Sequence, residues 1–504
     1  MPDPTLAELD HAHVWHPFTP MRQWCEKTPL VIESGDGPYL IDTEGKRYLD
    51  GVSSLWCNVH GHRVPALDQA IRDQLDQVAH TTLLGLASPP SIELAARLVR
   101  LTAEKLNPQD APLNKVFYTD AGATALEVAF KMAVGHWHHR GQPRKTRFIG
   151  LQGAYHGDTV GTMSVGYSDL FHRAFQSMVF PVDWFPTPDA LRPPPEFSHA
   201  TARACDTVEN AWPSEDPALA AALGDYCLSE LENLLEAQAD QTAAIVIEPV
   251  MQGAAGMVCQ PPGFVGRVAA LAKRYGVLLI ADEVAVGFGR TGKMFACEHD
   301  DVCPDILCLA KGLTAGYLPL AVTMTTDAIY DAFTGEPNEK KTLYHGHTYT
   351  GNPLACAVAL ASLDLFDQPP PGSDHADLID HINASAQLIR ERLEPLRDCP
   401  HVRDIRQRGI MVGIELGENL KLRPYAESSA NGQDIEAFDF SQTLGHEVCH
   451  ALREHGVIIR PLGNILVLMP IPATPAEAVA ELVDKVVAVV QGFGTKVGGT
   501  AIAQ

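Results

Sequence analysis

Two short apolar runs near the middle of the chain constrain its fold more than any other feature. The first, Val277–Ala281, ends in Asp282 and Glu283, and the second, Ile306–Ala310, ends in Lys311. Short apolar runs bounded by polar residues are typical of buried strands. If the two strands lie parallel in one sheet, Asp282 and Lys311 emerge at the same carboxyl-end edge, where open α/β sheets bind their ligands.

Helical and strand-like segments alternate along much of the chain, which favours such a sheet. Further strands are expected at Lys115–Thr119, Arg147–Gly150 and Ala243–Ile247, and helices at 66–79, 91–106, 123–139 and 263–275. This alternation is typical of α/β folds with a largely parallel sheet. The predicted fold class is therefore α/β.

A proline-rich segment, Asp367–Ser373, is the clearest linker in the sequence. The expected division is an N-terminal arm with part of a small domain at 1–65, a large domain at 66–366 and a small C-terminal α+β domain at 367–504. Residues 184–225 and 417–436 are expected to be irregular insertions, because the first is rich in proline, alanine and acids and the second is polar.

Composition narrows the partners and the compartment. The 504 residues carry a net charge of −24, which argues against nucleic acid and anionic membrane surfaces as partners. No apolar run reaches the length of a membrane span, and no apolar signal segment precedes the acidic start of the chain. The 11 cysteines form no C-x-x-C pairs, so reduced thiols and a cytoplasmic location are expected.

The pairing of Asp282 with Lys311 suggests pyridoxal phosphate (PLP). The aldehyde of this cofactor needs a lysine amine for a Schiff base, and its pyridine nitrogen needs a carboxylate that keeps it protonated. Each residue alone also has an ordinary explanation, because a lysine after a strand is usually solvated and an acid there usually caps a helix. The turn before the expected helix at 123 offers free N–H groups for a phosphate, and Tyr155 lies in a glycine-flanked turn where its ring could stack on a planar cofactor.

Two other motifs are set aside. The sequence GFGRTG at 287–292 matches a dinucleotide fingerprint, but five residues separate it from the strand and no helix opens at its third glycine. The sequence HEVCH at 446–450 matches a zinc motif, but no third ligand is evident and a solvated helix face explains it better. No metal site is expected.

The whole stretch from Asp282 to Lys311 resembles the signature of class III (omega) PLP-dependent aminotransferases. The resemblance rests on an apolar strand, Asp-Glu-Val, the sequence GFGRTG, and a lysine after the next strand; matching motifs run from Trp15 to about Pro472. It implies fold type I, with a mostly parallel, seven-stranded sheet in the large domain and a smaller α+β domain. It also implies an enzyme that uses PLP and exchanges amino groups between small molecules by a ping-pong mechanism.

The family pattern assigns cofactor roles position by position. It implies that Lys311 is the Schiff-base lysine and proton shuttle, and that Asp282 partners the pyridinium. Tyr155 is implied to stack on the cofactor ring, while Gly122 and Ala123 bind the phosphate through backbone N–H groups.

The same pattern implies that residues of two subunits build each site. Thr348 is implied to reach the phosphate of the neighbouring subunit's cofactor, which makes a homodimer with shared active sites the expected assembly. Trp56, Phe18 and Gly346, together with Tyr155, are implied to line the substrate pocket. Arg460 is implied to bind the carboxylate of the acceptor.

A narrower resemblance points to one branch of the family. The sequences WHPFT at 15–19, SSLWCNVHGH at 53–62 and IRPLG at 459–463 are similar to those of the enzymes that convert 8-amino-7-oxononanoate to 7,8-diaminononanoate in biotin biosynthesis. Three departures are Leu55 for a tryptophan, Ala121 for a serine and Phe18 for a tyrosine. The overall resemblance makes S-adenosylmethionine the expected amino donor. Lysine is the alternative, because Phe18 lacks the tyrosine hydroxyl that could help to bind S-adenosylmethionine. Two further alternatives remain. One is another class III aminotransferase, acting on ornithine, 4-aminobutyrate or another omega-amine, and the other is a cofactor-binding regulator without turnover.

Overall fold

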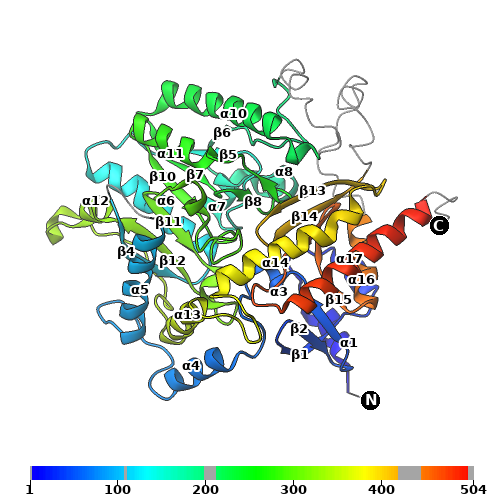
Figure 1. The fold of residues 1–504 in the computed structure, drawn as a ribbon. Helices are drawn as coiled ribbons and strands as arrows, with labels where there is room; N and C mark the ends of the chain where they lie inside the picture. The colour runs from blue at the N-terminus through cyan, green and yellow to red at the C-terminus, as the bar shows by residue number, and fades with distance from the viewer. Residues whose placement is uncertain (1–2, 107–110, 198–211, 418–443, 498–504) are drawn as a thin grey trace.

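The computed structural model describes residues 3–106, 111–197, 212–417 and 444–497, and these form a three-layer α/β body with smaller sheets beside it (Figure 1). The central sheet has 7 strands in the order β4-β12-β11-β10-β7-β5-β6. The strands are β4 (Leu113–Thr119), β12 (Ala321–Thr326), β11 (Ile306–Leu309), β10 (Leu278–Asp282), β7 (Thr242–Ile247), β5 (Arg147–Leu151) and β6 (Asp183–Phe185). Strand β12 pairs antiparallel with β11 and β4, while the other pairs are parallel. The predicted fold class is confirmed.

The central strands are apolar because helices cover both faces of the sheet. Every residue of β7, β10, β11 and β12 is buried, as expected for a parallel sheet between helix layers. Alternate residues contribute to two hydrophobic clusters: Val246 and Ile280 pack with α6 (Gly122–His139), whereas Ile247 and Leu279 pack with the helices of the other face. Those helices are α5 (Pro89–Leu106), α10 (Pro217–Gln238), α11 (Phe264–Tyr275) and α13 (Pro353–Phe366).

Helix α10 corrects the expectation for residues 184–225. The end of this segment is not irregular, because α10 begins at Pro217 and continues for 22 residues. Asp216 caps it, accepting hydrogen bonds from the N–H groups of Ala218 and Leu219, and a proline in the first turn is favourable at a helix start. Residues 198–211 of the first expected insertion and 418–436 of the second lie outside the described residues.

Two further four-stranded sheets contain the N-terminal and C-terminal segments. One has the order β1-β2-β3-β15 and the other β13-β14-β17-β16. Their strands are β1 (Ile32–Asp36), β2 (Tyr39–Asp42), β3 (Arg47–Asp50), β15 (Val457–Ile458), β13 (Val402–Arg408), β14 (Met411–Leu416), β17 (Ile465–Leu468) and β16 (Arg460–Leu462). Strand β3 pairs parallel with β15, so the N-terminal sheet lies beside the C-terminal part of the chain (Figure 1). The division at 65 and 366 stays a prediction.

The remaining elements are shorter or lie at the periphery. They are α1 (Leu6–His13), α2 (Met21–Cys25), α3 (Ser53–Trp56), α4 (Pro65–Leu75), α7 (Val160–Val165), α8 (Asp169–His172), β8 (Met251–Gln252), β9 (Val258–Cys259), α12 (Asp327–Tyr330), α14 (Leu378–Leu393), α16 (Leu444–Glu454) and α17 (Ala476–Val497). Within the described ranges, none of the helices is both long and apolar enough to cross a membrane.

Candidate active site

Asp282 and Lys311 lie at the same edge of the central sheet. Strands β10 and β11 are parallel, with Asp282 opposite Cys308, and Lys311 follows the end of β11. Lys311 has a φ of 46°, a left-handed conformation that is unusual for a residue with a side chain. Its side chain is half-buried, and its amine has no hydrogen-bond partner among the described residues. Burial of the ammonium lowers the pKa of Lys311, although the charges of Asp282 and Glu248 act in the opposite direction.

A buried histidine holds the carboxylate of Asp282. His156 Nδ1 lies 2.7 Å from Asp282 Oδ2, and Asp282 Oδ1 accepts the N–H of Val284 at 3.0 Å. Burial lowers the pKa of His156, but the hydrogen bond and the charge of Asp282 outweigh it, so the net pKa lies above its usual value. His156 therefore donates to Asp282. His156 Nε2 is buried without a hydrogen-bond partner.

Glu248 is another acidic residue at this edge, where β7 ends. Its carboxylate accepts the backbone N–H groups of Tyr155 and Gly253, each at 3.1 Å. Burial raises the pKa of Glu248 to about 7, so this carboxyl group titrates near neutral pH. Neither Glu248 nor His156 was assigned a role from the sequence. Glu248 directly follows β7, and His156 lies in the turn after β5, so the reasoning applied to the ends of β10 and β11 could have found both.

The turn that carries Tyr155 packs closely on the start of α6. The Tyr155 hydroxyl donates to Asp158 at 2.7 Å, and burial raises the pKa of Tyr155. A Cβ on Gly157 would lie 2.4 Å from the Cβ of Ala123, so only glycine permits this approach. The turn and the helix start therefore hold one fixed arrangement.

The start of α6 offers backbone donors. Ala121 precedes the helix and has no side-chain oxygen to cap it; its own N–H donates to Thr124 Oγ1 at 3.0 Å. A Cβ on Gly122 would lie 2.6 Å from the side chain of Val284, which follows Asp282 by two residues. The N–H groups of Gly122 and Ala123 lie in the first turn of α6, where backbone donors have no partner within the helix and can bind an anion.

Trp56 reaches the site from the short element α3, whose four residues form a left-handed turn. The φ angles of Ser53, Ser54, Leu55 and Trp56 are 50°, 48°, 70° and 66°, and each such residue costs roughly 1–2 kcal/mol. The Trp56 indole is buried, with its ring centre 5.3 Å from the Lys311 amine. By contrast, Leu55, which departs from the tryptophan of the family pattern, is 51% exposed.

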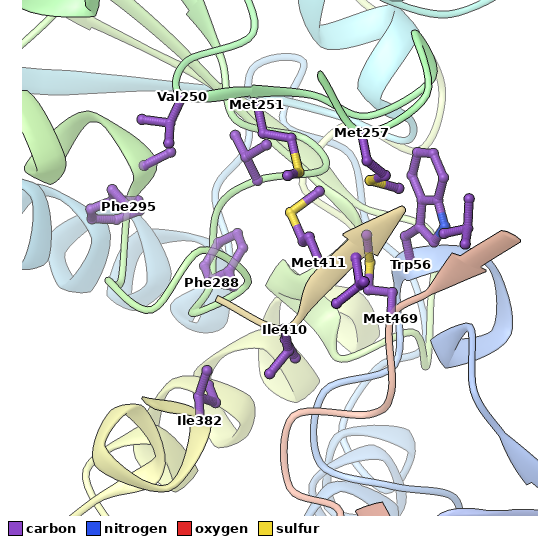
Figure 2. Close-up of a cluster of buried hydrophobic side chains, with 14 of the residues drawn as sticks. Trp56, Val250, Met251, Met257, Phe288, Phe295, Ile382, Ile410, Met411 and Met469 are labelled. Atoms are coloured by element: carbon purple, nitrogen blue, oxygen red, sulfur yellow. The ribbon is translucent and has the colours of Figure 1, made fainter. Parts of the chain in front are cut away.

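A methionine-rich cluster packs behind the indole. Figure 2 shows Trp56 beside Met257 and Met469, with Met411 and Met251 further along the same cluster. Methionine side chains adapt to irregular gaps and make favourable contacts with aromatic rings. On another side, a Cβ on Gly253 would lie 3.1 Å from the indole, so the ring is enclosed.

Arg290, the arginine of the GFGRTG sequence, holds this turn in place. It is 1% exposed and donates from Nη1 to Ser53 Oγ (2.9 Å) and Pro470 O (3.2 Å), and from Nη2 to Asn58 O (2.7 Å). Burial lowers the pKa of Arg290 to about 10. The GFGRTG sequence therefore forms a structural anchor, and no helix begins at its third glycine.

Four of the expected site residues are exposed in the single subunit. They are Phe18, Gly346, Thr348 and Arg460. Phe18 is 57% exposed, and its ring meets Phe171 edge-on with ring centres 5.6 Å apart. Within the described ranges, no hydrogen bond or ion pair links any of the four to Lys311, Asp282 or Tyr155.

In the zinc-like motif at 446–450, His446, Glu447 and His450 lie on the exposed face of α16, whereas Val448 and Cys449 face the core. In the part of the chain that the structure describes, no group of three or more His, Cys, Asp or Glu side chains is arranged to hold a metal ion.

The groups gathered at the sheet edge fit PLP. Lys311 supplies an amine with a lowered pKa, Asp282 supplies a carboxylate, and the free N–H groups at the start of α6 suit a phosphate. The unpartnered, buried His156 Nε2 also indicates a polar site that the protein alone does not satisfy.

The comparison with known families decides the class of the chain. The family model described as aminotransferase class-III matches residues 21–490. The chain belongs to the class III aminotransferases. This aminotransferase accordingly depends on PLP, as the family does, and the resemblance inferred from the sequence is confirmed.

Individual relatives of this aminotransferase extend over nearly its whole length. The adenosylmethionine-8-amino-7-oxononanoate aminotransferase of Geobacter sulfurreducens is 45% identical over 96% of this chain and 97% of its own. The crystal structure of the enzyme of that name from Methanocaldococcus jannaschii superimposes with a TM-score of 0.81 at 38% identity, covering 97% of this chain and 98% of its own. The omega transaminase of Pseudomonas jessenii in complex with PMP (pyridoxamine phosphate) gives a TM-score of 0.82 at 28% identity, covering 98% and 99%.

Proposed function

We propose that this aminotransferase converts 8-amino-7-oxononanoate to 7,8-diaminononanoate in biotin biosynthesis, with S-adenosylmethionine as the amino donor. The observation that carries the proposal is the 45% identity to the Geobacter sulfurreducens enzyme across nearly the full length of both chains. Relatives with the same name from Aquifex aeolicus and Methanocaldococcus jannaschii are 43% and 40% identical over 92% of this chain. The omega transaminases are similar in fold but only 28% identical in the Pseudomonas jessenii structure.

PLP, when bound, supplies a ring that withdraws electrons from the carbon bearing the reacting amino group. Lys311 would hold the cofactor through its aldehyde, and its amine would then carry the proton to and from the reacting carbon of the substrate. An amine can accept a proton only when neutral, and burial lowers the pKa of Lys311 toward that state. The same amine acts in reverse when the ketone acceptor is aminated.

The residues around Lys311 orient and hold the cofactor. Asp282, fixed by His156 at 2.7 Å, would pair with the pyridine nitrogen of the cofactor and favour its protonated form. The ring of Tyr155 would stack on the cofactor, and the N–H groups of Gly122 and Ala123 would bind its phosphate.

Substrate contacts come from several segments of the chain. Arg460 binds the carboxylate of the acceptor, and its guanidinium is exposed without an ion-pair partner among the described residues. Trp56, Phe18, Gly346 and Tyr155 form the walls of the pocket.

We propose a homodimer whose two active sites are shared, with Thr348 binding the phosphate of the partner's cofactor. Two neighbouring segments of this chain support a protein interface, because Leu84, Leu86, Tyr344 and Tyr349 are large, apolar or aromatic, and exposed. Residues 80–86 and 344–351 meet at the ring contact between His80 and Tyr349, with ring centres 4.9 Å apart. Sedimentation of the holoenzyme tests the dimer, and a monomer at micromolar concentration would contradict it.

We place the enzyme in the cytoplasm. The cysteines within the described ranges are all free thiols, which fits a reducing compartment. Fractionation of the producing cells tests this location.

The amino donor is tested directly. Purified holoenzyme is supplied with 8-amino-7-oxononanoate and either S-adenosylmethionine or lysine, and the 7,8-diaminononanoate formed is measured. Turnover with S-adenosylmethionine is expected, whereas turnover with lysine alone would assign lysine as the donor. Phe18→Tyr is the matched variant: restoring one hydroxyl should lower the KM for S-adenosylmethionine about two- to tenfold, the worth of one neutral hydrogen bond.

A further inference from the structure

The left-handed turn at Ser53–Trp56 requires a feature that stabilises it. Its four residues all have φ between 48° and 70°, and none is glycine, the residue that adopts this conformation freely. Arg290 holds only the first residue of the turn and the segment after it, through Ser53 Oγ and Asn58 O. The middle of the turn must be held by other groups.

Asp50, three residues before the turn, supplies these contacts. Its carboxylate is 2% exposed. Oδ1 accepts the N–H groups of Ser54 at 2.9 Å and Val52 at 3.4 Å, and Oδ2 accepts Ser54 Oγ at 2.7 Å and lies 3.1 Å from His62 Nε2. Two contacts go to Ser54, a central residue of the turn, and His62 is the one other side chain within hydrogen-bond distance of Asp50 in the described part of the chain.

The turn in its observed shape places Trp56 against two parts of the active site. The indole centre lies 5.3 Å from the Lys311 amine. The ring also lies against Gly253, whose N–H donates to Glu248. A change in the turn would therefore move a ring that contacts the amine responsible for proton transfer.

We propose that Asp50 is a positioning residue of the active site: its carboxylate holds the left-handed turn, and through it fixes the Trp56 indole beside Lys311. The kinetic part of the test rests on the proposed function, whereas hydrogen exchange does not depend on any substrate.

Asp42 provides a matched control in the same sheet. It is 6% exposed and also accepts several hydrogen bonds, from the N–H groups of Lys46 (2.9 Å) and Glu44 (3.0 Å) and from the Tyr48 hydroxyl (2.8 Å). These contacts stabilise the turn between β2 and β3, away from Trp56. Asp42→Asn therefore perturbs a buried carboxylate of similar surroundings without touching the left-handed turn.

The first measurement is hydrogen–deuterium exchange of the cofactor-free protein. In the turn, Trp56 N–H donates to Val52 O at 2.8 Å and Cys57 N–H donates to Ser53 O at 3.0 Å. Asp50→Asn should speed exchange of the peptide covering 53–58 about tenfold or more, the worth of one hydrogen bond to a charged group. Asp42→Asn should leave this peptide unchanged. Equal exchange of 53–58 in both variants would overturn the proposal.

The second measurement separates kcat from KM. Asp50→Asn should lower kcat about tenfold or more relative to Asp42→Asn, with a smaller change in acceptor KM, because the affected ring lies at the Lys311 amine. Leu55→Gly in the Asp50→Asn background should restore part of kcat, since glycine adopts the left-handed conformation without strain.

If Asp50→Asn does not fold, Ser54→Ala removes only the hydroxyl contact with Asp50 and should show the same effects at about threefold. Unchanged exchange and kcat in Ser54→Ala would refute the assignment, whereas a wild-type enzyme inactive on oxononanoate would refute only the proposed function.

Discussion

Replacing Arg290 with methionine tests how much the buried guanidinium contributes to stability. The change removes three hydrogen bonds and leaves the carbonyl oxygens of Asn58 and Pro470 without this donor. Hydrogen bonds to a charged group are worth about 1.5–3 kcal/mol each. Burial of the charge offsets part of this contribution, because the lowering of the Arg290 pKa to about 10 corresponds to roughly 3 kcal/mol of destabilisation. The expected net loss in the free energy of unfolding is therefore about 1.5–6 kcal/mol.

Urea unfolding of the cofactor-free protein, followed by far-UV circular dichroism, measures this loss. Arg290→Lys should lose a large part of the same stability, because a single ammonium cannot extend to both sides as the planar guanidinium does. Arg22→Met is the control, since Arg22 is 95% exposed in its side chain and should change stability by less than about 0.5 kcal/mol. A loss in Arg290→Met no larger than that of the control would refute the reasoning.

Three other predictions concern the chemistry of the site. Lys311→Ala should fold and bind PLP without a covalent link, with essentially no turnover. The role of Lys311 would be excluded if the variant kept both the absorbance of covalently bound cofactor and multiple turnovers. Arg460→Ala should raise the acceptor KM about ten- to a hundredfold, the worth of a charge-assisted contact, and an unchanged KM would contradict the role. For Glu248, the folded pKa of about 7 lies above the unfolded value of 4.5, so the native state binds the extra proton between these values and loses stability as pH rises through them. Glu248→Gln should therefore gain stability relative to wild type from pH 5 to pH 7, by up to about 3 kcal/mol, and a pH-independent difference would show that Glu248 does not titrate there.

Much of the sheet could be predicted because its strands are buried on both faces. Strands β7, β10 and β11 read as short apolar runs, and the groups at their ends follow from the parallel arrangement. The start of helix α10 was not predicted, because the segment before and around it is rich in proline, alanine and acids, a composition that suggested an irregular insertion. The N-cap at Asp216 was the local signal for a helix start.

The left-handed turn at Ser53–Trp56 could not be predicted from its own residues. None of them favours positive φ, and the contacts that hold the turn come from elsewhere: Asp50 is local, but Arg290 is 237 residues away in sequence. Tertiary contacts therefore override the local preference. The exposed residues Phe18 and Thr348 are a different case, since the roles expected for them involve groups that the single chain does not contain.

The pairing of β3 with β15 has a consequence for the synthesis of the chain. Leu49 lies opposite Val457, and the Leu49 N–H donates to Gly456 O at 2.8 Å. At about 5–20 residues per second, the ribosome needs roughly 20–80 s to add the residues between these two strands. During that time the edge of β3 lacks its native partner and can pair with other chains. The N-terminal strands of this aminotransferase are therefore exposed to aggregation and to chaperones during most of the synthesis of the chain.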